Sequence, residues 1–154
     1  MKVRGAAVAG AYYRCEDEPI LDEQGFLDTG DVGTLDPAGY LHITDRSKDV
    51  IKSGGEWISS IELENLAIGH PDVVEAAVIG VAHPKWDERP LLIIVPKPGR
   101  ALGKEEMLAF MTDKIAKWWL PDDVVLVEAI PHTATGKIQK TALREMFKDY
   151  RLPG

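Results

Sequence analysis

Four short segments of the sequence carry side chains whose types suit the binding of nucleotides and phosphates. The first is TGD at residues 29–31, in a tight turn after an apolar pair at 26–27. An aspartate held by such a turn can accept two hydrogen bonds from neighbouring hydroxyls, as on a ribose. The alternative is that Asp31 only caps the turn, and the tripeptide alone leaves both interpretations open.

The second segment is a dense run of charge at residues 45–49, between two apolar runs. Arg46 offers a planar fork for ribose or phosphate oxygens, and Lys48 offers a flexible point charge. A run of this kind is also typical of a solvated turn. By itself it does not decide between binding and solvation.

The third segment is KSGGEW at residues 52–57, where apolar pairs on both sides of the glycines predict a β-hairpin. Paired glycines let a backbone approach a ligand closely or adopt a positive φ. The alternative is an ordinary hairpin turn with Trp57 packed in the core. Both interpretations stay open at this point.

The fourth segment is PHTATGKI at residues 131–138, a polar, mobile-looking loop ahead of a predicted helix. A lysine displayed there, Lys137, could stabilise charge that develops on a carboxylate and a phosphate. The segment is not a phosphate-binding P-loop, because position 131 is proline where that motif needs glycine. Ile138 also replaces the required serine or threonine.

The composition narrows the class of protein. A formal net charge of −7 argues against a general nucleic-acid interface, which needs a basic face. The single Cys15 has no internal disulfide partner, which fits a reducing compartment. No metal site is expected, because the four histidines lack metal-like spacing. No transmembrane segment is expected either, because no apolar run approaches ~20 residues, and we expect a cytoplasmic protein.

The pattern of elements predicts an α+β fold with a boundary near residues 45–50. Residues 1–45 are rich in turns, with a half-buried strand expected at 40–44 and few apolar residues to bury. Beyond them a helix is expected to open at a capping box of Ser59 and Glu62 and to stop at Gly69. The other expected elements are the hairpin 50–58, strands at 73–81, 91–95 and 124–127, and helices at 105–119 and 140–150. Together they predict a short sheet flanked by helices.

Taken together, the order and spacing of the four segments resemble those of adenylate-forming enzymes. GFLDTGDVG at 25–33 resembles their Thr-Gly-Asp motif, although Phe26 stands where many relatives have tryptophan. The stretch 39–64 resembles their hinge and following loop, and 130–145 resembles their C-terminal lysine motif. Within that superfamily, GGEWISS at 54–60 is most similar to fatty-acyl-CoA synthetases.

The resemblance implies a division of the chain and a reaction. Residues 1–45 would be the tail of a large N-terminal adenylation domain, and 46–154 the mobile C-terminal lid domain. In this family a carboxylate and ATP give acyl-AMP and pyrophosphate, after which CoA takes the acyl group and AMP leaves. The family's phosphate loop, magnesium-binding glutamate and acyl pocket lie upstream of the matching region. The chain alone is therefore expected to bind ATP weakly and to turn over nothing.

The resemblance also assigns roles to individual residues. The catalytic residue would be Lys137, near the α-phosphate and carboxylate in the first half-reaction, and the hinge would be Lys48. The residues implied to bind ATP or AMP are Asp31, Arg46, Lys52 and Trp57. The residues implied to line the CoA tunnel are Gly54, Gly55 and Glu56.

The implied partners are a fatty acid, ATP, CoA and the enzyme's own N-terminal adenylation domain, which would also supply the Mg²⁺ ligands. A homodimer would form through that domain, so this chain is expected to be a monomer. One alternative is another adenylate-forming enzyme, such as an aryl-CoA ligase or a peptide-synthetase adenylation domain. A different alternative is a non-catalytic regulatory or binding module that kept the fold.

Overall fold

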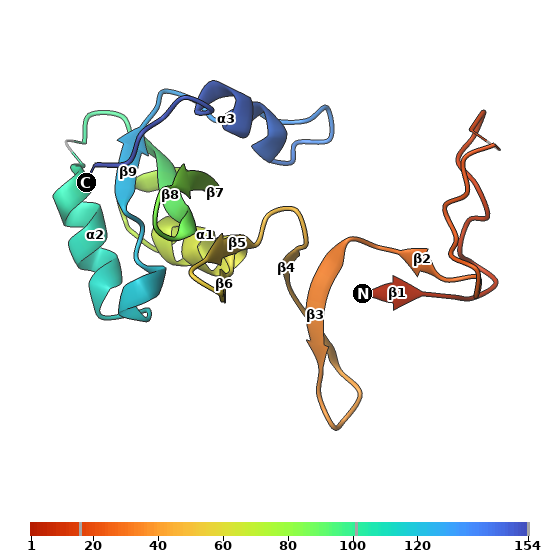
Figure 1. Ribbon diagram of the computed structural model, residues 1–154. Helices are drawn as coiled ribbons and strands as arrows, with labels where there is room; N and C mark the ends of the chain where they lie inside the picture. The colour runs from red at the N-terminus through yellow and green to blue at the C-terminus, as the bar shows by residue number, and fades with distance from the viewer. Residues whose placement is uncertain (16, 101, 154) are drawn as a thin grey trace. The chain divides into compact units, whose positions relative to one another are not determined.

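The computed structural model describes residues 1–15, 17–100 and 102–153, and its contacts divide the chain into two compact units (Figure 1). The first unit is Met1–Lys48 and the second is Asp49–Gly154. The division after Lys48 lies within residues 45–50, where the element pattern places the boundary, and three residues beyond the stretch 1–45 that the resemblance implies. That the two units belong to two different domains of a larger enzyme stays a prediction.

The first unit consists of two small antiparallel ribbons. Strand β1 (Lys2–Val3) pairs with β2 (Leu27–Asp28), and β3 (Asp31–Leu35) pairs with β4 (Leu41–Arg46). The strand expected at 40–44 is present, but its expected half-buried alternation is wrong. Leu41 and Ile43 are 49% and 51% exposed, because a two-stranded ribbon cannot bury a face by itself.

The second unit is built on a five-stranded sheet, which confirms the α+β class and the hairpin. Its strands are β5 (Ile51–Ser53), β6 (Glu56–Ile58), β7 (Val73–His83), β8 (Asp87–Pro96) and β9 (Asp123–Leu126). The order is β6-β5-β8-β7, and β9 lies parallel to β8. Strands β7 and β8 extend beyond the expected runs 73–81 and 91–95, since they continue to a tight hairpin turn at residues 84–86.

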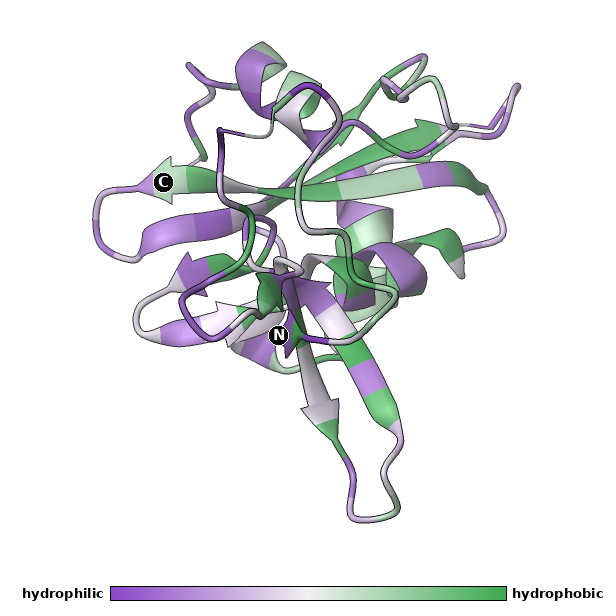
Figure 2. Cartoon of the chain, turned by 90° about the vertical axis from the view of Figure 1, so that its right-hand side faces the viewer, coloured by the Kyte–Doolittle hydropathy of each residue, from purple (hydrophilic) through white to green (hydrophobic). Residues whose placement is uncertain are grey.

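Helices cover both faces of this sheet, so that its two central strands are buried on each side (Figures 1 and 2). Successive side chains of a strand point to opposite faces, which explains why the runs in β7 and β8 are continuously apolar. On one face, Ala76, Val78, Leu92 and Ile94 pack with α1 (Ser60–Ile68) and α2 (Lys104–Thr112) and form the first core. On the other face, Ala77, Ile79, Leu91 and Ile93 pack with α3 (Lys140–Met146) and form the second core.

The start and end of α1 are as the sequence predicts. The Ser59 hydroxyl accepts a hydrogen bond from the Glu62 N–H at 3.2 Å, which satisfies a donor of the first turn. The helix then ends at Gly69. None of the helices within the described ranges is long and apolar enough to cross a bilayer.

The two later helices are shorter than predicted. The single helix expected at 105–119 is wrong: α2 ends before Asp113, Ala116 is extended, and a 3-10 turn η1 follows at Lys117–Trp119. The break lets Trp119 and Leu120 pack against the first core. The helix expected at 140–150 is also wrong in length, since α3 ends at Met146. The chain turns there, the rings of Phe147 and Tyr150 meet edge to face, and both residues pack against the second core.

Candidate active site

In the first unit, the β3–β4 register brings Asp31 opposite Arg46. Arg46 Nε lies 3.0 Å from Asp31 Oδ1, and the carboxylate is 19% exposed. The turn before Asp31 is capped by its neighbours: Asp28 Oδ1 accepts the Gly30 N–H, and Thr29 Oγ1 accepts the Asp31 N–H. The turn is thus capped by Asp28 and Thr29, while the Asp31 carboxylate pairs with Arg46, and its role in ribose binding stays a prediction.

A pocket of about 470 Å³ adjoins this pair, with Asp31 in its lining. Its other lining residues are Met1, Val32, Gly33, Leu35, Leu41 and Ser47. Ser47 is fixed in place because both its N–H and its hydroxyl donate to the Gly30 carbonyl, at 2.8 and 2.9 Å. Gly30 itself has φ +70°, a conformation that favours glycine. The Asp31 carboxylate therefore lies at the edge of this pocket, on a turn that hydrogen bonds from Gly30 to Asp28 and from Ser47 to Gly30 hold in place.

In the second unit, the predicted glycine hairpin is closed against the turn between β7 and β8. Gly54 and Gly55 have φ of +58° and +90°. The Gly54 N–H donates to the Trp86 carbonyl at 2.8 Å, and a Cβ on Gly54 would lie 2.7 Å from a ring carbon of Trp86. Position 54 thus excludes any side chain, whereas position 55 faces open space.

Lys52 and Trp57 lie opposite each other on the two strands of this hairpin. The Lys52 N–H donates to Glu88 Oε2 at 3.0 Å. Trp57 is 60% exposed, so the interpretation that it packs in the core is wrong. Ser53 and Glu56 form the pair next to the turn.

Arg89, on β8, ties this hairpin to η1 and is a residue that the sequence reasoning missed. Its guanidinium, 11% exposed, donates to Ser53 Oγ at 3.1 Å and to the carbonyls of Trp118 and Leu120 at 2.7 and 3.0 Å. It also pairs with Asp122 at 2.6 Å. No sequence signal marks it, since its partners lie about 30 residues or more away in the chain.

A pocket of about 320 Å³ opens beside Arg89. The rings of Trp86 and Trp118 lie in its lining together with Gly54 and Glu56. Both tryptophans are exposed although they are large and apolar. Flat aromatic rings beside an open glycine turn suit the passage of an elongated ligand, with stacking available for a planar group.

The loop that carries Lys137 is a closed, hydrogen-bonded turn. His132 pairs with Ile138, the Thr133 N–H donates to the Lys137 carbonyl at 2.8 Å, and Thr133 Oγ1 accepts the Lys137 N–H at 3.2 Å. His132 Nε2 also lies 3.2 Å from Glu75 Oε1 on β7. Within the described ranges, the Lys137 ammonium has no ion pair or hydrogen bond. The loop therefore presents this amine to solvent.

Lys48 is the last residue of the first unit, and the next residue, Asp49, is fixed by a 2.6 Å ion pair to Arg144 on α3.

Among the residues that the structure describes, no group of three histidine, cysteine, aspartate or glutamate side chains could hold a metal ion. Each unit thus has its own set of candidate residues: the Asp31–Arg46 pair in the first, and the glycine hairpin and Lys137 loop in the second.

Comparison with known proteins identifies the second unit. Residues 62–137 match the AMP-binding enzyme C-terminal domain family. The chain carries an AMP-binding enzyme C-terminal domain. The match begins within α1 and ends at Lys137, so it covers β7, β8, α2 and β9.

Similarity to proteins of this family extends over nearly the whole chain. Over 97% of its own length, this chain is 58% identical to 3-methylmercaptopropionyl-CoA ligase of Ruegeria pomeroyi. Over 99% of its own length, it is 47% identical to medium-chain-fatty-acid–CoA ligase of Ectopseudomonas oleovorans. The chain spans about 28% of the length of each of these relatives.

A solved structure supports the fold. The o-succinylbenzoate CoA synthetase MenE of Bacillus subtilis, in complex with its acyl-adenylate intermediate, matches 99% of the chain at 32% identity with a TM-score of 0.83. This chain covers 31% of that structure. The small α+β fold is therefore that of the C-terminal domain of adenylate-forming enzymes.

Proposed function

We propose that this chain is the C-terminal part of an ATP-dependent acid–CoA ligase that acts on an aliphatic carboxylic acid, with a fatty acid as the first candidate. The carboxylate attacks the α-phosphate of ATP to give acyl-AMP and pyrophosphate. The CoA thiol then attacks the acyl carbon and releases AMP. The observation that carries the proposal is the similarity to two CoA ligases over 97% and 99% of the chain, which spans both the Asp31–Arg46 pair and the Lys137 loop.

Lys137 is proposed to act in the first half-reaction. The attacking carboxylate and the α-phosphate are both anionic, and negative charge builds up on the phosphate and on the pyrophosphate that leaves, so a fixed cation lowers the energy of that arrangement. The loop suits this role because its backbone is tied through Thr133 while the ammonium stays unpaired within the described ranges. The loop thus fixes the base of the side chain and leaves its charge available.

Asp31 is proposed to accept hydrogen bonds from the two ribose hydroxyls of ATP, with Arg46 in support. The guanidinium occupies one carboxylate oxygen at 3.0 Å and orients the group, so lone pairs remain for the hydroxyls. Lys52 and Trp57 are proposed to face the nucleotide in one of the two poses. Lys48 is proposed as the hinge, which accords with its position at the end of the first unit.

Gly54, Gly55 and Glu56 are proposed to border the channel through which the pantetheine arm of CoA reaches the acyl carbon. Gly55 faces open space, Gly54 lets the ring of Trp86 pack directly on the turn, and the pocket with Trp86 and Trp118 adjoins Gly54. Arg89 holds the hairpin and η1 together and so keeps the two walls of that pocket in place.

The remaining parts of the reaction are proposed to reside in a large adenylation domain, the chain's main partner. That domain would supply the acid pocket and the Mg²⁺ ligands for ATP. A cytoplasmic location and a monomeric state for this chain on its own belong to the same proposal. Sedimentation that showed a tight dimer of the chain at micromolar concentration would contradict the monomer.

A chimeric enzyme tests the proposal. This chain would replace the matching C-terminal segment of the Ectopseudomonas oleovorans medium-chain ligase, and pyrophosphate release and acyl-CoA formation would be measured with a panel of acids. We expect both products to form. A correctly folded chimera that releases no pyrophosphate would contradict the proposal, provided that the unmodified relative is active in the same assay.

The second candidate is a ligase for aromatic acids, and the similarity to the o-succinylbenzoate CoA synthetase favours it. Acid choice would be set in the adenylation domain, so the chimera cannot test it. An assay of this chain joined to its natural adenylation domain can test it. Preference of that enzyme for an aromatic acid over a fatty acid would support the second candidate. Transfer to a phosphopantetheine-loaded carrier protein in place of CoA would instead indicate a peptide-synthetase type of enzyme.

A further inference from the structure

The residues after α3 form a tail, residues 147–153, that is anchored to the second core. Phe147, Tyr150 and Leu152 pack against this core. The Tyr150 hydroxyl donates to Asp123 Oδ2 on β9 at 2.5 Å. Because alternate side chains of an extended segment point in opposite directions, the anchoring of Tyr150 and Leu152 leaves Arg151 on the other side.

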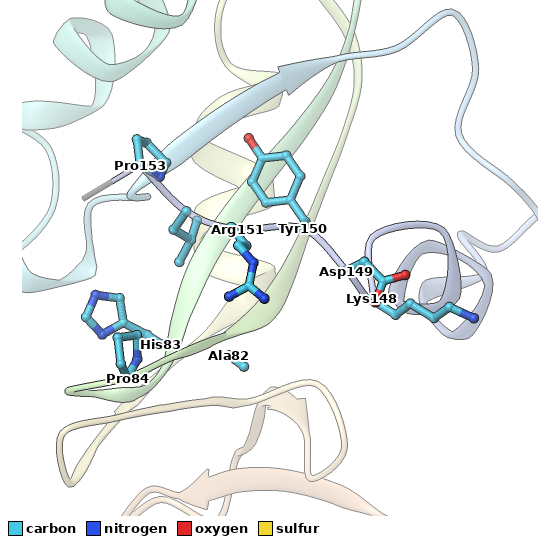
Figure 3. Close-up of a pocket in the computed structure, with 9 residues that line it drawn as sticks. Ala82, His83, Pro84, Lys148, Asp149, Tyr150, Arg151 and Pro153 are labelled. Atoms are coloured by element: carbon cyan, nitrogen blue, oxygen red, sulfur yellow. The ribbon is translucent and has the colours of Figure 1, made fainter.

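A pocket of about 520 Å³ lies between this tail and the end of β7. Figure 3 shows the Arg151 guanidinium directed from the tail toward the end of β7, where Ala82 and His83 lie. The other lining residues are Pro84, Lys148, Asp149, Tyr150, Leu152 and Pro153. A cation thus points into a space that is closed on one side by the strand and on the other by the tail.

The charges in the pocket are distributed unevenly. Lys148 is paired with Glu145 at 2.6 Å, and Figure 3 shows its ammonium directed away from His83, with Asp149 beside it. At the other end, Arg151 has no ion pair or hydrogen bond within residues 1–15, 17–100 and 102–153. The Arg151 end is therefore an uncompensated positive site in a protein whose net charge is −7.

His83 adds a hydrogen-bond donor to the lining of the pocket. Its Nδ1 accepts the N–H groups of Lys85 and Trp86 at 3.1 and 3.2 Å, which fixes the ring and places the proton of the neutral imidazole on Nε2. The half-buried ring lines the pocket. Nε2–H is thus free of the turn and can donate to a ligand.

We propose that this pocket is an anion site that takes the phosphate group of a small phosphomonoester. The Arg151 fork can bind two oxygens of a phosphate in parallel, and the His83 N–H can bind a third. A carboxylate has only two oxygens, which the fork alone would occupy. The volume exceeds that of a bare phosphate ion, and Pro84, Leu152 and Pro153 offer an apolar wall for the organic part of the ligand. The proposal does not depend on the proposed ligase function.

The test is a backbone amide NMR titration of the chain with glycerol 3-phosphate, inorganic phosphate and hexanoate in parallel. We expect saturable shifts of the amides of Ala82, His83, Lys85, Arg151 and Leu152, with the organic phosphate tighter than inorganic phosphate. Arg151→Gln should weaken binding at least about tenfold, which corresponds to ~1.4 kcal/mol. Equal affinity for all three anions, or tighter binding of hexanoate, would overturn the phosphate assignment.

Two further variants sharpen the result. His83→Asn keeps an acceptor near the position of Nδ1 for the turn N–H groups but removes the Nε2 donor, so a severalfold loss of affinity is expected while the fold is kept. Arg100→Gln is the matched control, since Arg100 is an exposed arginine paired with Asp72 at the opposite end of β7. Equal effects of Arg100→Gln and Arg151→Gln, or no saturable shift up to about 20 mM, would overturn the proposal.

Discussion

The two units of this chain differ in how they bury apolar side chains. The second unit encloses two hydrophobic cores, one on each face of a five-stranded sheet. In the described part of the first unit the one buried residue is Asp45, while Leu35, Leu41 and Ile43 are exposed. The contrast indicates that the second unit contains the determinants of its own stability, whereas the first lacks a core of its own.

Separating the units should give the largest effect. Residues 49–154 alone should unfold in urea in one cooperative transition with nearly the midpoint of the whole chain, because both cores lie within them. Residues 1–48 alone should show no cooperative transition, because a two-stranded ribbon without a core is at best marginal. Urea melts followed by circular dichroism check both expectations, and a cooperative melt of 1–48 would break the comparison.

A matched pair of truncations tests the same contrast at single residues. Ile93 is fully buried on β8 in the second core, and Ile93→Ala should lower the free energy of unfolding by about 2–5 kcal/mol. Ile43 on β4 is half exposed, and Ile43→Ala should change it by less than ~0.5 kcal/mol. Equal losses in the two variants, measured by urea unfolding, would contradict the account.

The hydrogen bond between the Tyr150 hydroxyl and Asp123 should make the free energy of unfolding depend on pH in the alkaline range. Burial, followed by the hydrogen bond to Asp123 and its charge, raises the pKa of Tyr150 from 10.0 to about 12. The folded-state pKa is the higher one, so this stabilisation is fully present below about pH 10 and is lost between pH 10 and 12. The loss should be at most about 3 kcal/mol, since each pKa unit corresponds to ~1.4 kcal/mol.

Tyr150→Phe is the control for this dependence. Its difference in unfolding free energy from the parent chain should shrink as pH rises from 9 to 12. A difference that stays constant over that range would show that the hydroxyl does not contribute through Asp123.

Two turn substitutions give the smallest expected effects and opposite signs. Asp87, at the start of β8, has φ +72°, a conformation that costs a non-glycine residue of order 1 kcal/mol. Asp87→Gly should therefore stabilise the second unit by up to about 1 kcal/mol. Gly55→Ala should destabilise it by a similar amount, since φ is +90° there although the space is open. Thermal melts of the two variants check the signs.

The sequence predicts those parts of the fold that depend on neighbouring residues. The hairpin at Gly54 and Gly55 and the Ser59 cap of α1 follow from local chemistry, and both are confirmed. The end of α2 was missed because the apolar spacing continues through Ile115, whereas the break serves packing against distant strands. The end of α3 was missed for the same reason.

The candidate site divides in the same way. Asp31 and Arg46 are paired across one short ribbon, as a turn between two strand-like runs allows. The role of Arg89 could not be predicted from the sequence, because it depends on contacts with Ser53, Trp118 and Asp122. These residues are distant in the chain and come together only in the folded domain. The roles of the site residues remain predictions, because they concern ligands and a second domain.

The most direct test of the central proposal separates the two half-reactions in the chimeric ligase with and without Lys137→Ala. Pyrophosphate release from ATP and acid reports the first, and acyl-CoA formation from supplied acyl-AMP reports the second. The account predicts that the variant loses the first by about 100-fold or more and keeps the second within a few fold. Equal losses in both, in a chimera that is folded, would contradict the assignment of Lys137 to adenylate formation.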